Sequence, residues 1–168
     1  MFLFLPEEWR NGKDINMAEN EKIKVILCDD HKILREGLRK LLELEKDIEV
    51  IAEAESGEEA INKAAQLQPD IVLMDINMPA LDGVSATRKI KQENPKIAVI
   101  ILTVYADEKY LYEAMKAGAM GYLLKDISSN ELIEAMRTVY SGGALIQPSM
   151  ASKFIKEFSS LKEEAPQE

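Results

Sequence analysis

The sequence predicts an α/β fold in which a five-stranded parallel sheet is covered by helices on both faces. Five short apolar runs alternate with longer amphipathic segments, as repeated strand-helix units require. The first residues of the runs are 25, 22, 27 and 23 positions apart, so the spacing is regular. Several runs are rich in Ile and Val on both alternating faces, which is typical of strands buried from both sides. The predicted strands are residues 23–28, 48–54, 70–74, 97–102 and 120–124.

The helix expected after the first strand has a single apolar stripe. Its leucines recur at i, i+4, i+7 and i+8, the period of one helix face. These leucines are Leu34, Leu38, Leu41 and Leu42. The charged residues between them occupy the opposite face and are therefore expected to be exposed. They are Arg35, Glu36, Arg39, Lys40 and Glu43.

Local signals predict where later helices begin and end. Ser56 with Glu59, and Ser128 with Glu131, have the spacing of capping boxes. Gly118 and Gly142 follow the helices near residues 108–117 and 130–140, where a left-handed residue can close the last turn. With the apolar runs between them, these signals give five strands and five helices.

A further helix is expected after the five units. Pro148 suits its first turn, and five apolar residues share one side of it. They are Met150, Phe154, Ile155, Phe158 and Leu161. This helix either packs against its own domain or bridges to a partner domain or a second subunit, and the sequence favours neither.

Composition limits the classes of function. The 168 residues suit one compact domain, and 21 Lys and Arg against 30 Asp and Glu give a net charge of −9, which opposes direct DNA binding. The single cysteine, Cys28, excludes an internal disulfide framework. No apolar run approaches the roughly 18 residues of a membrane span, so we expect a cytoplasmic protein without a membrane segment.

Polar side chains follow four of the five predicted strands. In an open parallel sheet the functional crevice lies beyond the carboxyl ends of the strands. That rule selects Asp29 and Asp30, Asp75, Thr103 and Lys125, which follow the first, third, fourth and fifth strands respectively. Each residue alone has a simpler explanation, such as a helix cap, a turn or an exposed charge. Their joint placement at one edge favours a site.

The chemistry expected of this set is phosphoryl transfer. Three crowded carboxylates repel each other unless a cation joins them, and a cluster of oxygen ligands suits Mg²⁺. A lysine and a hydroxyl group can hold the oxygens of a phosphoryl group. Asp75 is then the candidate nucleophile, because carboxylates accept phosphate as an aspartyl phosphate. His31 beside the acidic pair is expected to be a surface group, and Cys28 a buried strand residue.

Four motifs carry a resemblance to a known family. They are Ile-Leu-Cys-Asp-Asp-His at 26–31, Asp-Ile-Val-Leu-Met-Asp-Ile-Asn-Met-Pro at 70–79 with Asp-Gly at 82–83, Ile-Ile-Leu-Thr at 100–103, and Ala-Gly-Ala-Met-Gly-Tyr-Leu-Leu-Lys-Asp at 117–126. In these motifs the chain closely resembles the receiver domain of bacterial two-component response regulators. The resemblance covers residues 23 to about 143.

The resemblance implies a doubly wound, flavodoxin-like sheet with strand order 2-1-3-4-5. It also implies that Asp75 accepts phosphate from a sensor histidine kinase. Mg²⁺ would be bound directly by Asp30 and Asp75, by Asp29 through water, and by the main-chain carbonyl of Asn77. Thr103 and Lys125 would hold the phosphoryl oxygens, while Thr103 and Tyr122 would form the conformational switch. Such a protein is a regulatory phospho-acceptor, not an enzyme acting on other substrates.

The ends of the chain add further expectations. Gly142, Gly143 and the helix after Pro148 resemble the linker of the subfamily with a helix-turn-helix DNA-binding output domain. Residues after Leu161 are too few for that domain, so DNA contact is expected only through a domain missing from this chain. The predicted division is a disordered extension at 1–22, a receiver at 23–143, a linker helix at 144–161 and a polar tail at 162–168. A homodimer is possible in this subfamily.

Two other functions compete with this interpretation. A Mg²⁺-dependent phosphohydrolase with an aspartyl nucleophile generally has a second aspartate two residues further on, where this sequence has Asn77. A flavin-binding domain needs a phosphate loop after the first strand, where Asp29 and Asp30 would repel the cofactor. The cognate kinase, its signal, the target genes and the dimer interface cannot be inferred from the residues.

Overall fold

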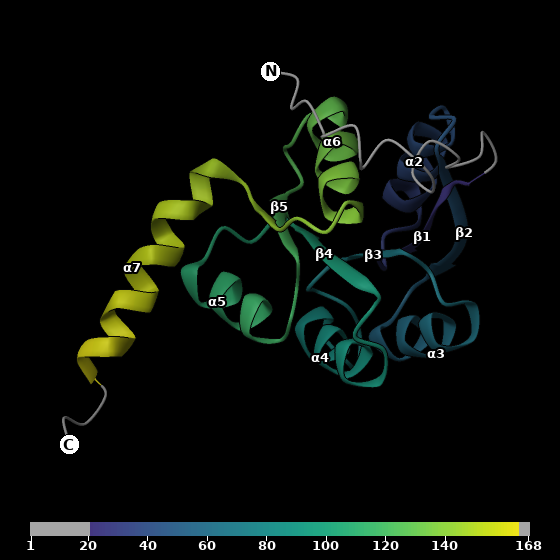
Figure 1. Ribbon diagram of the computed structural model, residues 1–168. Helices are drawn as coiled ribbons and strands as arrows, with labels where there is room; N and C mark the ends of the chain where they lie inside the picture. Colours follow the sequence, from purple (N-terminus) through teal and green to yellow (C-terminus); the bar gives the residue numbers. More distant parts are fainter. Residues whose placement is uncertain (1–20, 165–168) are drawn as a thin grey trace, which may run out of the picture.

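Six parallel strands form one sheet in the computed structural model, which describes residues 21–164 and places side chains as far as Leu161 (Figure 1). The strand order is β2-β1-β3-β4-β5-β6, so the predicted order of the first five strands is confirmed. A sixth strand of two residues joins β5 at the edge and was not predicted. The strands are β1 (Ile23–Cys28), β2 (Ile48–Ala54), β3 (Ile71–Met74), β4 (Ala98–Thr103), β5 (Gly121–Leu124) and β6 (Leu145–Ile146).

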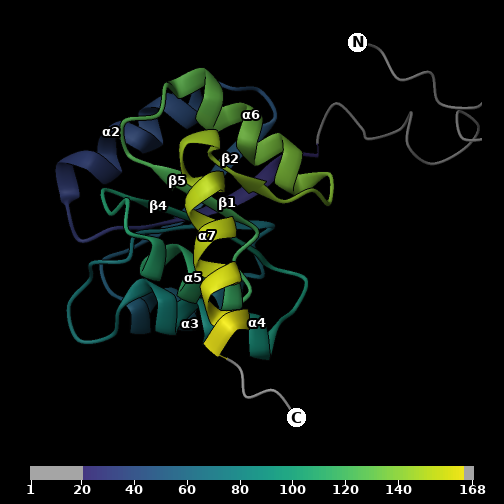
Figure 2. The same ribbon diagram turned by 90° about the vertical axis from the view of Figure 1, so that its left-hand side faces the viewer.

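Helices cover both faces of the sheet, as predicted. Figures 1 and 2 show α2 and α6 on one face and α3, α4 and α5 on the other, with α7 beside α5. The helices are α2 (Lys32–Glu43), α3 (Gly57–Leu67), α4 (Gly83–Glu93), α5 (Glu108–Lys116), α6 (Ser129–Tyr140) and α7 (Pro148–Glu164). None of the helices in residues 21–164 has the length and hydropathy that a membrane span requires.

The sheet divides the core into two apolar layers. In β1, Ile26 and Cys28 face the layer under α3, α4 and α5, whereas Val25 and Leu27 face the layer under α2 and α6. All four side chains are at most 2% exposed. Cys28 is therefore a buried strand residue, as expected. Burial of the strands from both sides explains why the apolar runs lack a polar alternation.

The helix boundaries agree with the capping signals, with one exception. Ser128 and Glu131 form a full capping box at the start of α6. Ser56 caps α3 by accepting a hydrogen bond from the Glu59 main chain, but the Glu59 carboxylate accepts from Glu55 N at 3.1 Å, not from Ser56. The second box is thus only half formed. Gly118 and Gly142 have φ angles of 103° and 96°, the left-handed conformation predicted for helix ends.

The predicted exposure of one charged residue of α2 is wrong. Arg35 was expected to be exposed with the other charged residues, yet only 5% of it is accessible. It is buried because α2 packs across the end of β2, where the carboxylates of Glu53 and Glu55 accept hydrogen bonds from its guanidinium group. Of the four leucines, only Leu42 is fully buried and the other three are half-buried. The buried stripe of α2 therefore includes a cation.

The C-terminal helix α7 contacts α5 through its first turns. Met150 is 1% exposed, and Lys153 Nζ donates a hydrogen bond to the Ala106 carbonyl at 3.0 Å. Ile155, one turn further, is 65% exposed. The beginning of this helix thus packs on its own domain. The domain boundaries stay a prediction, because most of the proposed 1–22 extension and the end of the 162–168 tail lie outside the described residues.

Candidate functional site

Four strands bring the predicted polar residues to one edge of the sheet. Asp29 follows β1, Asp75 follows β3, Thr103 ends β4 and Lys125 follows β5. The main chain of Asp75 donates to the Cys28 carbonyl at 2.9 Å, and that of Lys125 donates to the Thr103 carbonyl at 2.8 Å. Each loop is therefore tied to the neighbouring strand at the point where its functional side chain leaves the sheet.

The ammonium group of Lys125 lies between two buried carboxylates. Its Nζ is 2.7 Å from Asp29 Oδ2 and 3.3 Å from Asp75 Oδ2. The side chains of Asp29 and Asp75 are 5% and 4% exposed, and that of Lys125 is 13% exposed. Residues 29, 75 and 125, distant in sequence, thus form a shared ionic cluster shielded from solvent.

The two aspartates of the cluster differ in their electrostatics. Burial acts to raise the pKa of the Asp29 carboxyl, but hydrogen bonds from Lys125 and from His31 outweigh it and lower the pKa below its usual value. Burial raises the pKa of Asp75, and Lys125 offsets this only in part while the Asp29 charge adds to it. Asp29 is therefore the stable anion, and Asp75 is the carboxylate whose charge is poorly compensated.

Asp30 and His31 complete the acidic side of the cluster. The His31 main chain donates to Asp29 Oδ1 at 2.8 Å, and His31 Nδ1 lies 3.1 Å from one carboxylate oxygen each of Asp29 and Asp30. His31 occupies the N-cap position of α2 without a side-chain cap, so neither aspartate is that cap. The His31 side chain is 66% exposed, as expected of a surface group, but its contacts with the acidic pair were not predicted.

The donor set fits a hard divalent cation. One ligand atom from each of Asp29, Asp30, His31 and Asp75 lies within 4.8 Å of all the others. Carboxylate oxygens are the ligands that Mg²⁺ prefers, and few protein ligands suffice because Mg²⁺ retains several waters. Asn77, two residues beyond Asp75, is exposed in the segment between β3 and α4. Its carbonyl stays a predicted ligand.

Thr103 and Tyr122 lie on adjacent paired strands. Thr103 is completely buried, and its Oγ1 accepts a hydrogen bond from Tyr105 N at 3.3 Å. Tyr122 is also completely buried, and its hydroxyl donates to the Tyr105 carbonyl at 2.6 Å. The main chain of Tyr105 thus connects the two predicted switch residues. This connection was not predicted from the sequence.

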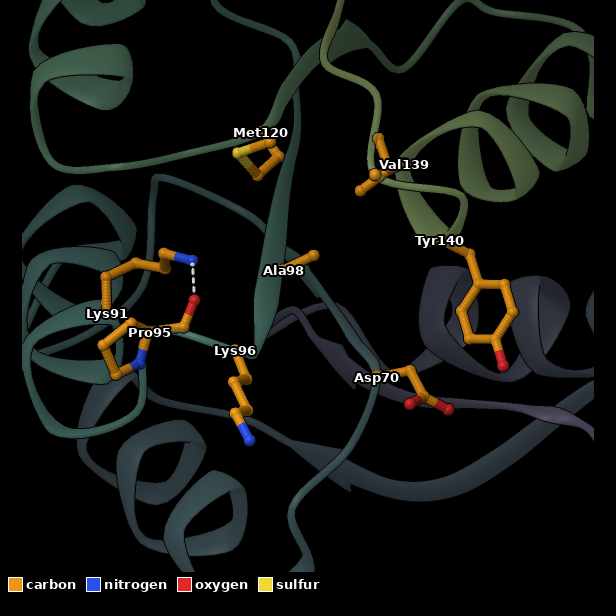
Figure 3. A pocket seen from close by; sticks show the side chains of 9 residues that line it. Asp70, Lys91, Pro95, Lys96, Ala98, Met120, Val139 and Tyr140 are labelled. Carbon is orange, nitrogen blue, oxygen red and sulfur yellow. Dashed lines mark hydrogen bonds between the residues drawn. The ribbon is translucent and has the colours of Figure 1, made fainter. Parts of the chain in front are cut away.

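A cavity of about 280 Å³ lies at the opposite edge of the sheet (Figure 3). Asp70, Ala98 and Met120, which line it, lie at the amino ends of β3, β4 and β5. The ammonium group of Lys91, across the cavity, already donates to the Pro95 carbonyl at 2.7 Å and to the Ile97 carbonyl at 2.8 Å. The cavity is separate from the acidic cluster and contributes nothing to it.

Comparison with known proteins gives one consistent result. Residues 25–137 match the family described as response regulator receiver domain. The chain is 43% identical over 155 residues to the transcriptional regulatory protein DegU of Brevibacillus brevis, covering 92% of this chain and 66% of that protein. It is 44% identical to LnrK of Bacillus subtilis (strain 168), another transcriptional regulatory protein, over 141 residues that cover 84% of this chain and 64% of that protein.

A solved structure agrees with both. A two-component response regulator of the LuxR family from Aurantimonas sp. SI85-9A1 superimposes with a TM-score of 0.78 at 33% identity, covering 83% of this chain and 99% of that chain. The curated relatives are longer, since the chain spans slightly less than two thirds of each of the two named above.

Proposed function

Because this chain belongs to the response regulator receiver family, we propose that it is a phosphorylation-operated switch whose acceptor is Asp75. The observation that carries the proposal is the position of Lys125, whose ammonium group lies within 3.3 Å of the Asp75 carboxylate. A fixed positive charge there neutralises the oxygens of an arriving phosphoryl group. Asp75, whose own charge is only partly compensated, is the group in the cluster best suited to react.

The reaction proposed is transfer from a phosphohistidine of a sensor kinase. An oxygen of Asp75 forms a bond to phosphorus as the P–N bond of the phosphohistidine breaks. The departing nitrogen keeps the electron pair and is protonated, and Asp75 becomes a mixed anhydride. Lys125 and the Thr103 hydroxyl then hold phosphoryl oxygens, while Asp29 keeps Lys125 in place through the 2.7 Å contact.

The acidic side of the cluster is proposed to hold Mg²⁺. Asp30 and Asp75 would bind it directly, Asp29 through water and Asn77 through its main-chain carbonyl. When bound, the ion supplies positive charge to the phosphoryl oxygens. Asp30 suits this role, because its side chain is 36% exposed and water can reach it, and Mg²⁺ retains several waters.

The conformational readout is proposed to involve Thr103 and Tyr122. A phosphoryl group on Asp75 would draw the Thr103 hydroxyl toward it and leave room for the Tyr122 ring. In the structure this ring is already completely buried and bonded to the Tyr105 carbonyl. We therefore propose that phosphorylation stabilises a buried arrangement the protein also adopts without it, which shifts the population of states around α5 and β5.

Replacing Tyr122 with phenylalanine is the test of that readout. The change removes only the hydroxyl group and leaves the Tyr105 carbonyl without this donor, so we expect a loss of about 1 kcal/mol in unfolding free energy. The beryllofluoride-induced NMR shifts of Thr103 and the β4–α5 segment should also become smaller. Full-sized shifts in this variant would show that the hydroxyl has no part in the readout.

Partners beyond this domain are also proposals. The named relatives are transcriptional regulators and are longer than this chain. We propose that phosphorylation controls dimerisation or a helix-turn-helix output domain that makes the DNA contact. The net charge of −9 supports this division of roles, because a polyanion would be repelled by the chain itself.

Incubation with acetyl phosphate and Mg²⁺ tests the proposed function. We expect intact-mass spectrometry to show one added phosphoryl group, peptide mapping to place it on Asp75, and EDTA to prevent it. Label on another residue, or equal labelling in EDTA, would overturn the assignment.

The same preparation separates a switch from a phosphohydrolase. A switch should incorporate phosphate slowly and stoichiometrically, with no sustained turnover of a generic phosphate ester, since Asn77 provides no carboxyl group to act as acid and base. Multiple turnovers of the ester would favour the enzyme instead.

A further inference from the structure

Arg35 is a buried cation that the proposed function leaves unused. Its side chain is 6% exposed, and it lies in the first turn of α2. Three of its nitrogens donate hydrogen bonds: Nη1 to the Asp29 carbonyl at 2.6 Å, Nε to Glu53 at 3.0 Å and Nη2 to Glu55 at 2.9 Å. Burying a charge requires that it be paired in this way. The guanidinium fork therefore joins α2 to the end of β2 and to the turn after β1.

The contact with Asp29 is the one that matters for the site. The main chain of Asp29 also donates to the Ala54 carbonyl at 3.0 Å, and its carboxylate accepts from His31 N and Lys125 Nζ. Asp29 is thus held at its N–H, its carbonyl and both carboxylate oxygens. Among the described residues, Arg35 is the only one that makes one of these contacts with a buried side chain. Its contact lies at the base of the turn.

Arg35 also lies directly behind the cluster. Together with Asp29 and Asp75 it lines a void of about 10 Å³. That volume is at the lower limit for a single water molecule, so the space between these side chains is almost filled. Removing the arginine would leave the Asp29 carbonyl in a buried place without this donor.

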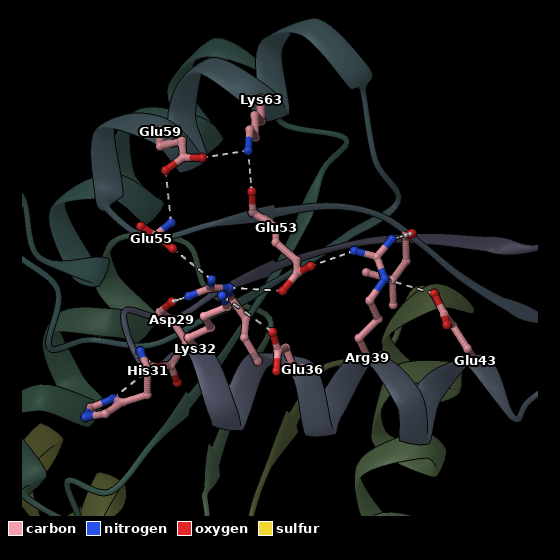
Figure 4. A network of polar contacts seen from close by, with 12 residues as sticks. Asp29, His31, Lys32, Glu36, Arg39, Glu43, Glu53, Glu55, Glu59 and Lys63 are labelled. Atoms are coloured by element: carbon pink, nitrogen blue, oxygen red, sulfur yellow. Dashed lines mark hydrogen bonds and ion pairs between the residues drawn. The ribbon is translucent and has the colours of Figure 1, made fainter.

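The outer partners of Arg35 belong to a wider ionic network (Figure 4). Glu53 uses its second oxygen to accept from Arg39 Nη1 at 2.6 Å. The Glu55 main chain donates to the Glu59 carboxylate at the start of α3, and Glu59 in turn lies 2.6 Å from Lys63 Nζ. Glu59 of α3 and Glu53 of β2 are in this way connected to the main chain of Asp29 through the side chain of Arg35.

We propose that Arg35 is a positioning residue for the cation site: by holding the Asp29 carbonyl it fixes the Asp29–Asp30 turn so that both carboxylates face Asp75. This proposal rests on the proposed function, because it assumes that the acidic cluster binds Mg²⁺. Partners behind metal ligands commonly change metal affinity by 10- to 100-fold when they are removed. Arg35 acts through Asp29 and needs no contact with the ion.

Arg39 provides a matched control on the same helix. It donates to the same Glu53 carboxylate, and also to Glu43 and to the Val50 carbonyl, but makes no hydrogen bond to Asp29. In the full chain, Mg²⁺ titrations followed by amide NMR shifts should give a dissociation constant raised at least about tenfold by Arg35→Met. In the same titration, Arg39→Met should change the Mg²⁺ dissociation constant by less than about twofold. Arg35→Lys, which keeps a charge and a donor, should recover part of the affinity.

Thermal unfolding in EDTA separates a general loss of stability from the positioning effect. Equal Mg²⁺ dissociation constants for Arg35→Met and wild type would overturn the proposal, as would equal weakening by Arg39→Met. Should Arg35→Met fail to fold, Arg35→Lys and Glu55→Gln decide in its place. Wild-type Mg²⁺ affinity in both of these variants would count against the proposal. A wild-type protein that shows no Mg²⁺-dependent shifts would instead contradict the proposed function itself.

Discussion

Asp75→Asn is expected to abolish phosphoryl incorporation and, at the same time, to make the folded domain more stable. Asparagine has no carboxylate to attack phosphorus, so labelling by acetyl phosphate should fall below detection. The gain in stability follows from burial, which raises the pKa of Asp75 against the partial compensation by Lys125. We expect an increase of about 1 kcal/mol at neutral pH, the size of a typical trade-off between function and stability.

The pH dependence of this gain has a definite sign. When folding raises the pKa of an acid, its ionised form destabilises the folded state at any pH above the raised pKa. This destabilisation disappears as the pH falls toward 3.8, the ordinary pKa of the group. Urea unfolding of wild type and Asp75→Asn at several pH values should therefore show a difference at pH 7 that shrinks in acid. A variant less stable than wild type at pH 7 contradicts this account.

Asp47→Asn is the matched control with the opposite sign. A hydrogen bond from Arg137, whose Nε lies 3.0 Å from Asp47 Oδ2, lowers the pKa of that carboxyl. Its carboxylate therefore stabilises the fold above its unfolded pKa, and this contribution is lost as the pH falls through the folded value. Because the side chain is 45% exposed, the loss at pH 7 should be under about 1 kcal/mol. Phosphoryl incorporation should be unchanged.

The sheet could be predicted because most of its strands can be recognised from their own short stretches of sequence. Strands β3, β4 and β5 are almost entirely buried runs of mostly apolar residues, and the observed ends of β1 and β2 coincide with the predicted runs 23–28 and 48–54. The short strand β6 could not be predicted, since two residues, Leu145 and Ile146, are too few to show a period. It forms only because the chain after α6 passes along the free edge of β5.

The site could be predicted in outline, because parallel strands place their carboxyl ends together. The positions of the strand ends therefore suffice to place Asp29, Asp75 and Lys125 at one edge of the sheet. Arg35 was missed because helical periodicity assigns every charged residue of α2 to solvent. The available signal was the pair Glu53 and Glu55, within and just after the end of the second strand, which accepts the hydrogen bonds of Arg35.

Gly83→Ala is expected to be the most destabilising small change near the site. Gly83 begins α4 directly behind Asp75, and a Cβ there would lie 1.9 Å from the Asp75 carbonyl oxygen and 2.9 Å from Ile76 Cα. Both neighbours are main chain, so the start of α4 must move away from β3. We expect a loss of about 3 kcal/mol in unfolding free energy and, because Asp75 moves with its carbonyl, slower phosphoryl incorporation in the folded fraction.

Gly37→Ala separates this clash from the general effect of adding a methyl group. Gly37 lies within α2, and a Cβ there would meet nothing within 4 Å. Alanine favours a helix over glycine by about 0.5–1 kcal/mol, so this variant should be more stable than wild type by that amount and label normally. Both variants can be compared by urea unfolding followed by circular dichroism. If Gly83→Ala unfolds within about 0.5 kcal/mol of wild type, the close approach of α4 to Asp75 does not hold the acceptor in place, and its position must depend on the β3 hydrogen bonds alone.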